Sequence, residues 1–137
     1  MHTNSETLPI LLVEDYEANI LVATMILENF GYHYEIARNG QEAVERFSPG
    51  KYSIILMDVE MPVTDGYDTT RHIREFEKAK NSVPVPIIAL TAHAIMGDRE
   101  RCITAGMDDY IAKPFTPDQL QTILLKHLKR SGTGKAA

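Results

Sequence analysis

Short apolar runs alternate with amphipathic stretches along the whole chain. Runs of four or five apolar residues bounded by polar or turn residues are typical of strands that are covered on both faces. The runs predict strands at about 10–13, 34–37, 53–57, 86–90 and 109–112. Apolar positions at helical spacing between them predict helices over about 17–30, 39–47, 66–80, 98–105 and 116–128.

This alternation of strands and helices decides the fold class. It favours parallel pairing with right-handed crossovers and places helices on both faces of the sheet. The chain is therefore predicted to be an α/β protein, a three-layer sandwich around a five-stranded parallel sheet. Asn39 is expected to cap the second helix, and residues 116–119 have the pattern of a capping box. The helical spacing in the first helix is followed by Ile20, Leu21, Thr24, Leu27 and Glu28. Ile73 and Phe76 are expected to be the clearest apolar anchors of the third helix.

Length, charge and cysteine content limit the function classes. The 137 residues fit one domain, expected over 8–130, with 1–7 and 131–137 as flexible termini. A net charge of -5 argues against a broad nucleic-acid-binding surface. Cys102 is the single cysteine, which suits a reducing, cytoplasmic compartment.

The sequence gives no sign of secretion or of a membrane segment. The amino-terminal residues do not resemble a secretory signal, and no apolar run approaches the ~20 residues of a membrane helix. We therefore expect no membrane contact by this domain.

Polar side chains stand where four of the predicted strands end. Glu14 and Asp15 follow the first strand, Asp58 the third, Thr91 the fourth and Lys113 the fifth. The carboxyl ends of parallel strands form one edge of an open sheet, so these side chains are expected to meet. Carboxylates at close range repel one another unless a cation offsets their charge, and oxygen ligands favour a hard ion such as Mg²⁺. Asp15 is expected to be the direct ligand and Glu14 the looser one.

The same edge has the groups that phosphoryl transfer needs. Once a cation offsets the carboxylates, Asp58 becomes a candidate nucleophile toward phosphorus, which would give an aspartyl phosphate. Lys113 can pair with one phosphoryl oxygen as a point charge, and the Thr91 hydroxyl can donate to another. A cation and an ammonium at a transferring phosphoryl group are the usual electrostatic arrangement for this chemistry.

Taken in order, these motifs resemble the receiver domain of two-component response regulators. The resemblance covers about 8–128 and includes the acidic pair at 14–15 and the acceptor within 56–62. It continues through 65–66, 89–92 and 113–115. The segment from residue 91 to residue 110 is most similar to receivers of hybrid sensor histidine kinases. The resemblance implies the flavodoxin-like strand order 2-1-3-4-5.

The family resemblance also assigns the acceptor and the cofactor. It implies that Asp58 accepts a phosphoryl group from a sensor histidine kinase, a histidine phosphotransfer protein or both. It implies a metal site made of Glu14, Asp15, Asp58 and the backbone carbonyl of Glu60. Mg²⁺ is the expected ion, and Mn²⁺ can take its place.

Further positions are expected to report or modulate phosphorylation. The resemblance makes Thr91 and Tyr110 the conformational switch, and it implies a cis peptide bond between Lys113 and Pro114. Glu60 and His93 each lie two residues beyond a key position, and both should overlook the phosphoryl group. Glu60 is expected to alter hydrolysis by repelling or orienting the attacking water.

The leading interpretation is thus a phosphorelay signalling module and not a turnover enzyme. It would assist only its own phosphorylation and dephosphorylation, would not bind nucleic acid directly, and could be part of a larger hybrid kinase. A Mg²⁺-dependent phosphohydrolase with an aspartyl-phosphate intermediate is the alternative, although such enzymes usually have Asp where Glu60 stands. A flavodoxin-like FMN binder is opposed by the acidic residues after the first strand. A receiver that only docks constitutively is disfavoured because every key position is filled.

Overall fold

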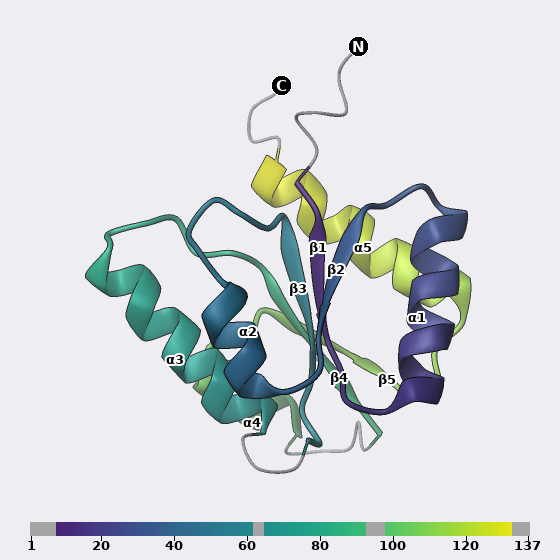
Figure 1. Ribbon diagram of the computed structural model, residues 1–137, viewed down its shortest axis with the longest axis horizontal. Helices are drawn as coiled ribbons and strands as arrows, with labels where there is room; N and C mark the ends of the chain where they lie inside the picture. Colours follow the sequence, from purple (N-terminus) through teal and green to yellow (C-terminus); the bar gives the residue numbers. More distant parts are fainter. Residues whose placement is uncertain (1–7, 62–64, 93–97, 133–137) are drawn as a thin grey trace.

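The computed structural model describes residues 8–61, 65–92 and 98–132. They form a sheet of five strands that is covered by five helices (Figure 1). The strands are β1 (Ile10–Val13), β2 (Tyr34–Ala37), β3 (Ile54–Asp58), β4 (Ile87–Thr91) and β5 (Asp109–Ala112). The helices are α1 (Glu17–Asn29), α2 (Gly40–Arg46), α3 (Gly66–Ala79), α4 (Asp98–Ala105) and α5 (Pro117–Gly132).

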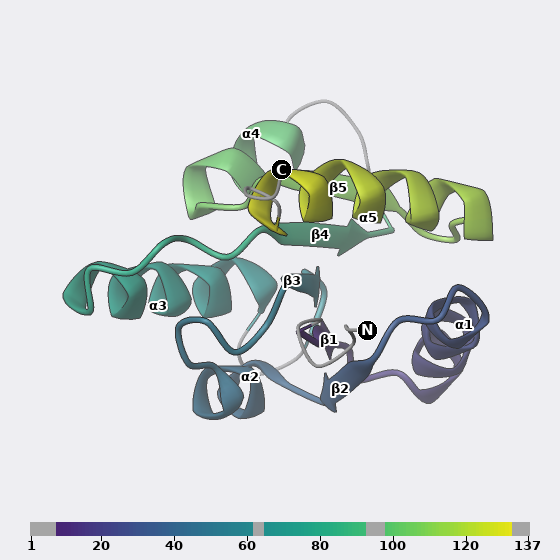
Figure 2. The ribbon, with the colours of Figure 1, turned by 90° about the horizontal axis from the view of Figure 1, so that it is seen from above.

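The sheet has the predicted order and direction. Its strands lie in the order β2-β1-β3-β4-β5, and every neighbouring pair is parallel. Seen from above, α1 and α5 cover one face of the sheet, and α2, α3 and α4 cover the other (Figure 2). The predicted three-layer α/β sandwich is therefore confirmed.

Both faces of the central strands are buried, which explains their continuous apolar sequences. Leu11 and Val13 of β1 pack into the core under α2, α3 and α4. Ile10 and Leu12 of the same strand pack into the core under α1 and α5. Successive strand residues point to opposite faces, so a strand covered on both sides needs apolar residues at every position.

Two helices, α2 and α5, begin where their sequence signals predict. The Asn39 side chain accepts a hydrogen bond from the Glu42 backbone N–H at 2.8 Å, and α2 begins at the next residue. Thr116 and Gln119 form a reciprocal capping box at the start of α5, with N···O distances of 2.9 and 3.1 Å. Within the part of the chain that the structure describes, no helix combines the length and apolarity needed to cross a membrane.

Two of the apolar positions chosen from helical spacing lie partly at the surface, although the Phe76 ring still packs edge-to-face against buried Phe47. Leu21 is 59% exposed and Phe76 is 39% exposed. On α1 the side chains that face the sheet include Ile20, Ala23 and Leu27. These positions recur at spacings of three and four residues, which keeps them on one helical face and turns Leu21 toward the surface.

Candidate functional site

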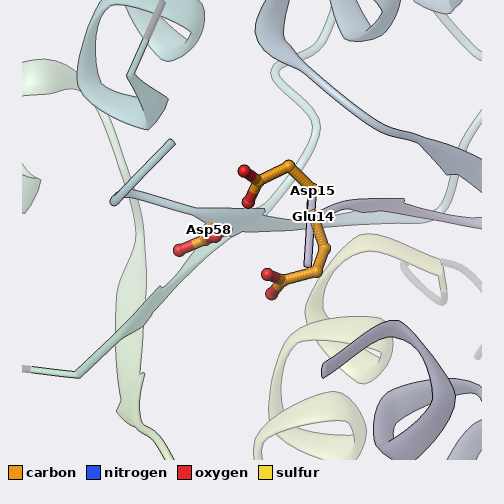
Figure 3. A group of neighbouring side chains, drawn as sticks. All are labelled: Glu14, Asp15 and Asp58. Atoms are coloured by element: carbon orange, nitrogen blue, oxygen red, sulfur yellow. The ribbon is translucent and has the colours of Figure 1, made fainter. Parts of the chain in front are cut away.

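Three carboxylates converge at the carboxyl ends of β1 and β3. Glu14 and Asp15 come directly after β1, and Asp58 is the last residue of the neighbouring strand β3. One carboxylate oxygen from each of the three lies within 4.8 Å of the other two. Glu14 and Asp15 leave the chain on opposite sides and both turn toward Asp58 (Figure 3). Because β1 ends at Val13, consecutive residues can turn toward one point.

The backbone around the acceptor strand is closely packed. Asp58 and Thr91 were expected just after their strands, but each is the final residue of its strand. Val59 N–H donates to the Leu90 carbonyl at 3.1 Å, so the sheet ladder reaches the site. A Cβ on Gly66 would lie 2.5 Å from the Asp58 carbonyl oxygen, so only glycine lets α3 begin this close to β3.

Two of the three carboxylates are buried. Glu14 and Asp58 are each 1% exposed, whereas Asp15 is exposed. The Lys113 ammonium lies 3.1 Å from Asp58 Oδ1 and 3.8 Å from Glu14 Oε1. Asn19 Nδ2 donates to Glu14 Oε2 at 3.2 Å. The Lys113 ammonium and the hydrogen bond from Asn19 only partly offset the free-energy cost of burying two negative charges.

This incomplete compensation changes the acidity of Glu14. Burial raises the pKa of the Glu14 carboxyl to about 7, and the nearby negative charge of Asp58 and a hydrogen bond to it act in the same direction. Lys113 and Asn19 oppose the rise in pKa. Near neutral pH the metal-free site therefore tends to keep a proton on Glu14, and a bound cation would displace that proton.

The raised Glu14 pKa predicts that the metal-free protein loses stability as pH rises. The folded-state pKa of about 7 lies above the ordinary value of 4.5, so the folded state binds more protons between these two values. Stability then decreases with rising pH across that window. Urea unfolding at about pH 5 and about pH 8, with a chelator present, measures the change. Glu14→Gln should lack most of this decrease, and an equal decrease in both proteins would contradict the prediction.

The ends of β4 and β5 bring further polar groups to the site. Thr91 ends β4 and is buried, and its hydroxyl donates to Glu60 Oε2 at 3.2 Å. The Ala92 N–H donates to Glu60 Oε1 at 3.2 Å. Lys113 follows β5, and its peptide bond to Pro114 is cis, as the resemblance implied. The Glu60 side chain thus contacts the end of β4.

The donor set fits a hard divalent cation. The cluster supplies only carboxylate oxygens, which Mg²⁺ prefers over nitrogen or sulfur ligands. The three negative charges, set against one ammonium, favour a cation of charge two. That Asp15 is the direct ligand, that Glu14 is the looser one, and that the Glu60 carbonyl takes part stay predictions.

The remaining candidates fall into different places. Tyr110 is half-buried, packs against the core under α4, and lines a groove between α4, β5 and α5. His93 lies outside the described residues. Sequence reasoning missed Asn19 and the Ala92 N–H. An amide side chain one turn into the helix after an acidic pair was the available signal for Asn19.

Comparisons with known proteins agree with this arrangement. A family model described as the response regulator receiver domain matches residues 10–125. Hybrid signal transduction histidine kinase B of Dictyostelium discoideum is 41% identical over 128 residues, which cover 87% of this chain and 6% of that protein. The chain spans between 6% and 16% of the length of the first curated relatives that it matches.

Solved structures show the same fold. A crystal structure of the receiver domain of sensor histidine kinase PA1611 from Pseudomonas aeruginosa PAO1 is 46% identical, with a TM-score of 0.78. The match covers 89% of this chain and 98% of the PA1611 chain. The PA1611 structure has a magnesium ion coordinated in its active site cleft. The receiver domain of Saccharomyces cerevisiae Ssk1, in complex with the histidine phosphotransfer protein Ypd1, gives a TM-score of 0.86 at 29% identity and covers 94% of both chains. The chain belongs to the response regulator receiver domain family.

Proposed function

We propose that the chain is a phosphorelay switch that accepts a phosphoryl group on Asp58, with Mg²⁺ as cofactor. One observation carries the proposal. The Asp58 carboxylate lies within 4.8 Å of two other carboxylates and 3.1 Å from the Lys113 ammonium. Such a site can hold a cation and a phosphoryl group together. Without the ammonium, a carboxylate cluster would repel the phosphoryl oxygens more strongly.

The acceptor step follows from these contacts. A carboxylate oxygen of Asp58 attacks phosphorus, and a new P–O bond forms while the bond from phosphorus to the donor's histidine nitrogen breaks. The donor imidazole then takes up a proton. Lys113 is positioned to offset negative charge on the phosphoryl oxygens, since it already pairs with the accepting carboxylate.

The cofactor's part is electrostatic. When bound, Mg²⁺ supplies positive charge that offsets the carboxylates and the phosphoryl oxygens. Glu14, Asp15, Asp58 and the carbonyl of Glu60 would hold it. Mn²⁺ prefers similar oxygen ligands and would substitute for it.

The response to phosphorylation would involve Thr91 and Tyr110. The Thr91 hydroxyl would donate to a phosphoryl oxygen on Asp58, and Tyr110 would turn from its groove toward the core. The protein would also assist hydrolysis of its own aspartyl phosphate. Glu60 and His93 are proposed to modulate that hydrolysis.

An apolar patch on α1 suits a phosphoryl-donor protein. Leu21, Val22 and Met25 are each about half exposed or more. Val22 lines a small pocket together with Glu14 and Lys113, so the patch reaches the acceptor site. The Ypd1 complex of a related receiver supports a histidine phosphotransfer protein as the occupant. A sensor histidine kinase, in the same polypeptide or a separate one, would be the upstream donor.

A cytoplasmic location stays a prediction from the single cysteine and the family. The phosphohydrolase alternative is not favoured because the residue two positions after Asp58 is Glu60, whose carboxylate accepts hydrogen bonds from Thr91 and Ala92.

A small phosphodonor such as acetyl phosphate tests the proposal without a partner protein. Incubation with Mg²⁺ should add the mass of one phosphoryl group to the intact protein. Hydroxylamine should remove the adduct, because it cleaves acyl phosphates and spares phosphate esters. A chelator should prevent its formation. Rapid multiple turnover of the donor without an adduct would favour the hydrolase, and an adduct that resists hydroxylamine would exclude an aspartyl phosphate.

A further inference from the structure

Glu60 links the ends of two neighbouring strands through its side chain. It lies in the segment after β3, and its carboxylate accepts from two groups at the end of β4. Thr91 Oγ1 lies 3.2 Å from Oε2, and Ala92 N lies 3.2 Å from Oε1 and 3.3 Å from Oε2. A carboxylate that accepts from a hydroxyl and an N–H together makes charge-assisted contacts, which are stronger than neutral ones.

The same residue also touches the proposed acceptor. The Glu60 backbone N–H donates to Asp58 Oδ1 at 3.0 Å. Its main chain thus contacts the acceptor carboxylate while its side chain contacts the proposed switch hydroxyl. Any anion that becomes attached to Asp58 and reaches for Thr91 has to compete with the Glu60 carboxylate.

Two physical facts keep the Thr91 hydroxyl from binding the Glu60 carboxylate and an oxygen attached to Asp58 at the same time. A threonine hydroxyl has a single proton, so Thr91 can donate to Glu60 or to an oxygen attached to Asp58, but not fully to both. A carboxylate and a phosphoryl group both have negative charge and repel each other at this range, although Glu60 is exposed and the solvent weakens that repulsion.

We infer that Glu60 is a positioning residue that holds the Thr91 hydroxyl and the Ala92 N–H while Asp58 is unphosphorylated, and that a group accepted by Asp58 displaces it. The inference rests on the proposed function of Asp58. Glu60 acts as an internal acceptor that opposes the switched state. Its effect therefore falls on the affinity for the phosphoryl group, in addition to any effect on hydrolysis.

The first test uses the protein without metal or phosphodonor. Amide hydrogen exchange measured by NMR should show Ala92 N–H exchanging faster in Glu60→Ala than in the natural protein, by roughly tenfold for the loss of a charge-assisted hydrogen bond. Glu60→Gln keeps an oxygen acceptor and should be intermediate. Glu75→Ala removes the same charge from an exposed position on α3 and should leave Ala92 unchanged. Equal exchange in the natural protein and Glu60→Ala would overturn the inference.

The second test uses beryllofluoride with Mg²⁺, a phosphoryl mimic that does not hydrolyse. Glu60→Ala should bind it roughly tenfold more tightly, because the Glu60 carboxylate no longer competes for the Thr91 hydroxyl. In a Thr91→Ala background the same substitution should have a clearly smaller effect, since one of the two contacts is already missing. An equal effect in both backgrounds would mean that Glu60 acts by charge alone, and unchanged or weaker binding by Glu60→Ala would also overturn the inference.

These tests separate failure of the inference from failure of the proposed function. If Asp58 accepts no phosphoryl group, neither the acetyl phosphate adduct nor beryllofluoride binding appears in the natural protein. If only the inference is wrong, both appear normally while the Glu60 variants behave like the Glu75 control. Urea unfolding of each variant checks that the substitutions have not unfolded the domain.

Discussion

Asp58→Asn is expected to abolish the phosphate adduct completely. An asparagine amide has nearly the shape of the carboxylate but is not a nucleophile toward phosphorus at neutral pH. Intact mass after incubation with Mg²⁺ and acetyl phosphate measures the outcome. Asp68→Asn is the matched control, because it removes one carboxylate from an exposed position on α3 and should form the adduct normally.

The same variant has a second, independent signature. Burial is the main cause of the raised Glu14 pKa, and the charge of Asp58 and a hydrogen bond to it raise the pKa further, so replacement of Asp58 should lower that pKa only part of the way toward 4.5. The decrease in stability with rising pH should shrink accordingly. An adduct at natural yield in Asp58→Asn would show that another residue is the acceptor.

Lys113→Ala is expected to slow adduct formation by about 10²–10³-fold, the usual cost of removing one group that stabilises charge in a transition state. Lys113 lies 3.1 Å from Asp58 Oδ1 and 3.8 Å from Glu14 Oε1, so it is placed to reach incoming phosphoryl oxygens. The initial rate of mass increase at saturating Mg²⁺ measures the effect. Lys126→Ala is the control, because it removes an exposed ammonium from α5.

Loss of Lys113 should also reduce the stability of the metal-free protein. Two buried carboxylates would lose their ammonium, and breaking such a buried pair costs about 3 kcal/mol or more. The loss should be smaller at low pH, where Glu14 is protonated, and Mg²⁺ should restore part of it. Adduct formation at the natural rate in Lys113→Ala would contradict the role given to this side chain.

The parallel strands and the edge where the site lies could be predicted from local patterns, whereas the order of the strands came from the family resemblance. Continuous apolar runs such as 54–57 are needed wherever helices cover both faces of a strand. Parallel strands bring their carboxyl ends to one edge, so Asp15 and Asp58, 43 residues apart in the sequence, are expected to be neighbours. The capping box at 116–119 is visible because its hydrogen bonds join residues three apart.

The side-chain partners could not be predicted in the same way. The contact between Glu60 and Thr91 joins the segment after β3 to the last residue of β4, and it depends on the path of the chain after β3. His127 is buried and its Nε2 lies 2.9 Å from Asp109 Oδ2, a contact between residues 18 apart in the sequence. Leu21 is apolar and helical but exposed, and periodicity alone does not tell a core position from a docking surface.

A crystal structure of the protein with Mg²⁺ and beryllofluoride tests the central claim most directly. The predicted result has the fluoride group attached to a carboxylate oxygen of Asp58 and within hydrogen-bond distance of Lys113 and Thr91. The metal should be held by oxygens of Asp15 and Asp58, with Glu60 turned away from Thr91. A metal bound away from these carboxylates, or beryllofluoride attached to another residue, would contradict the account.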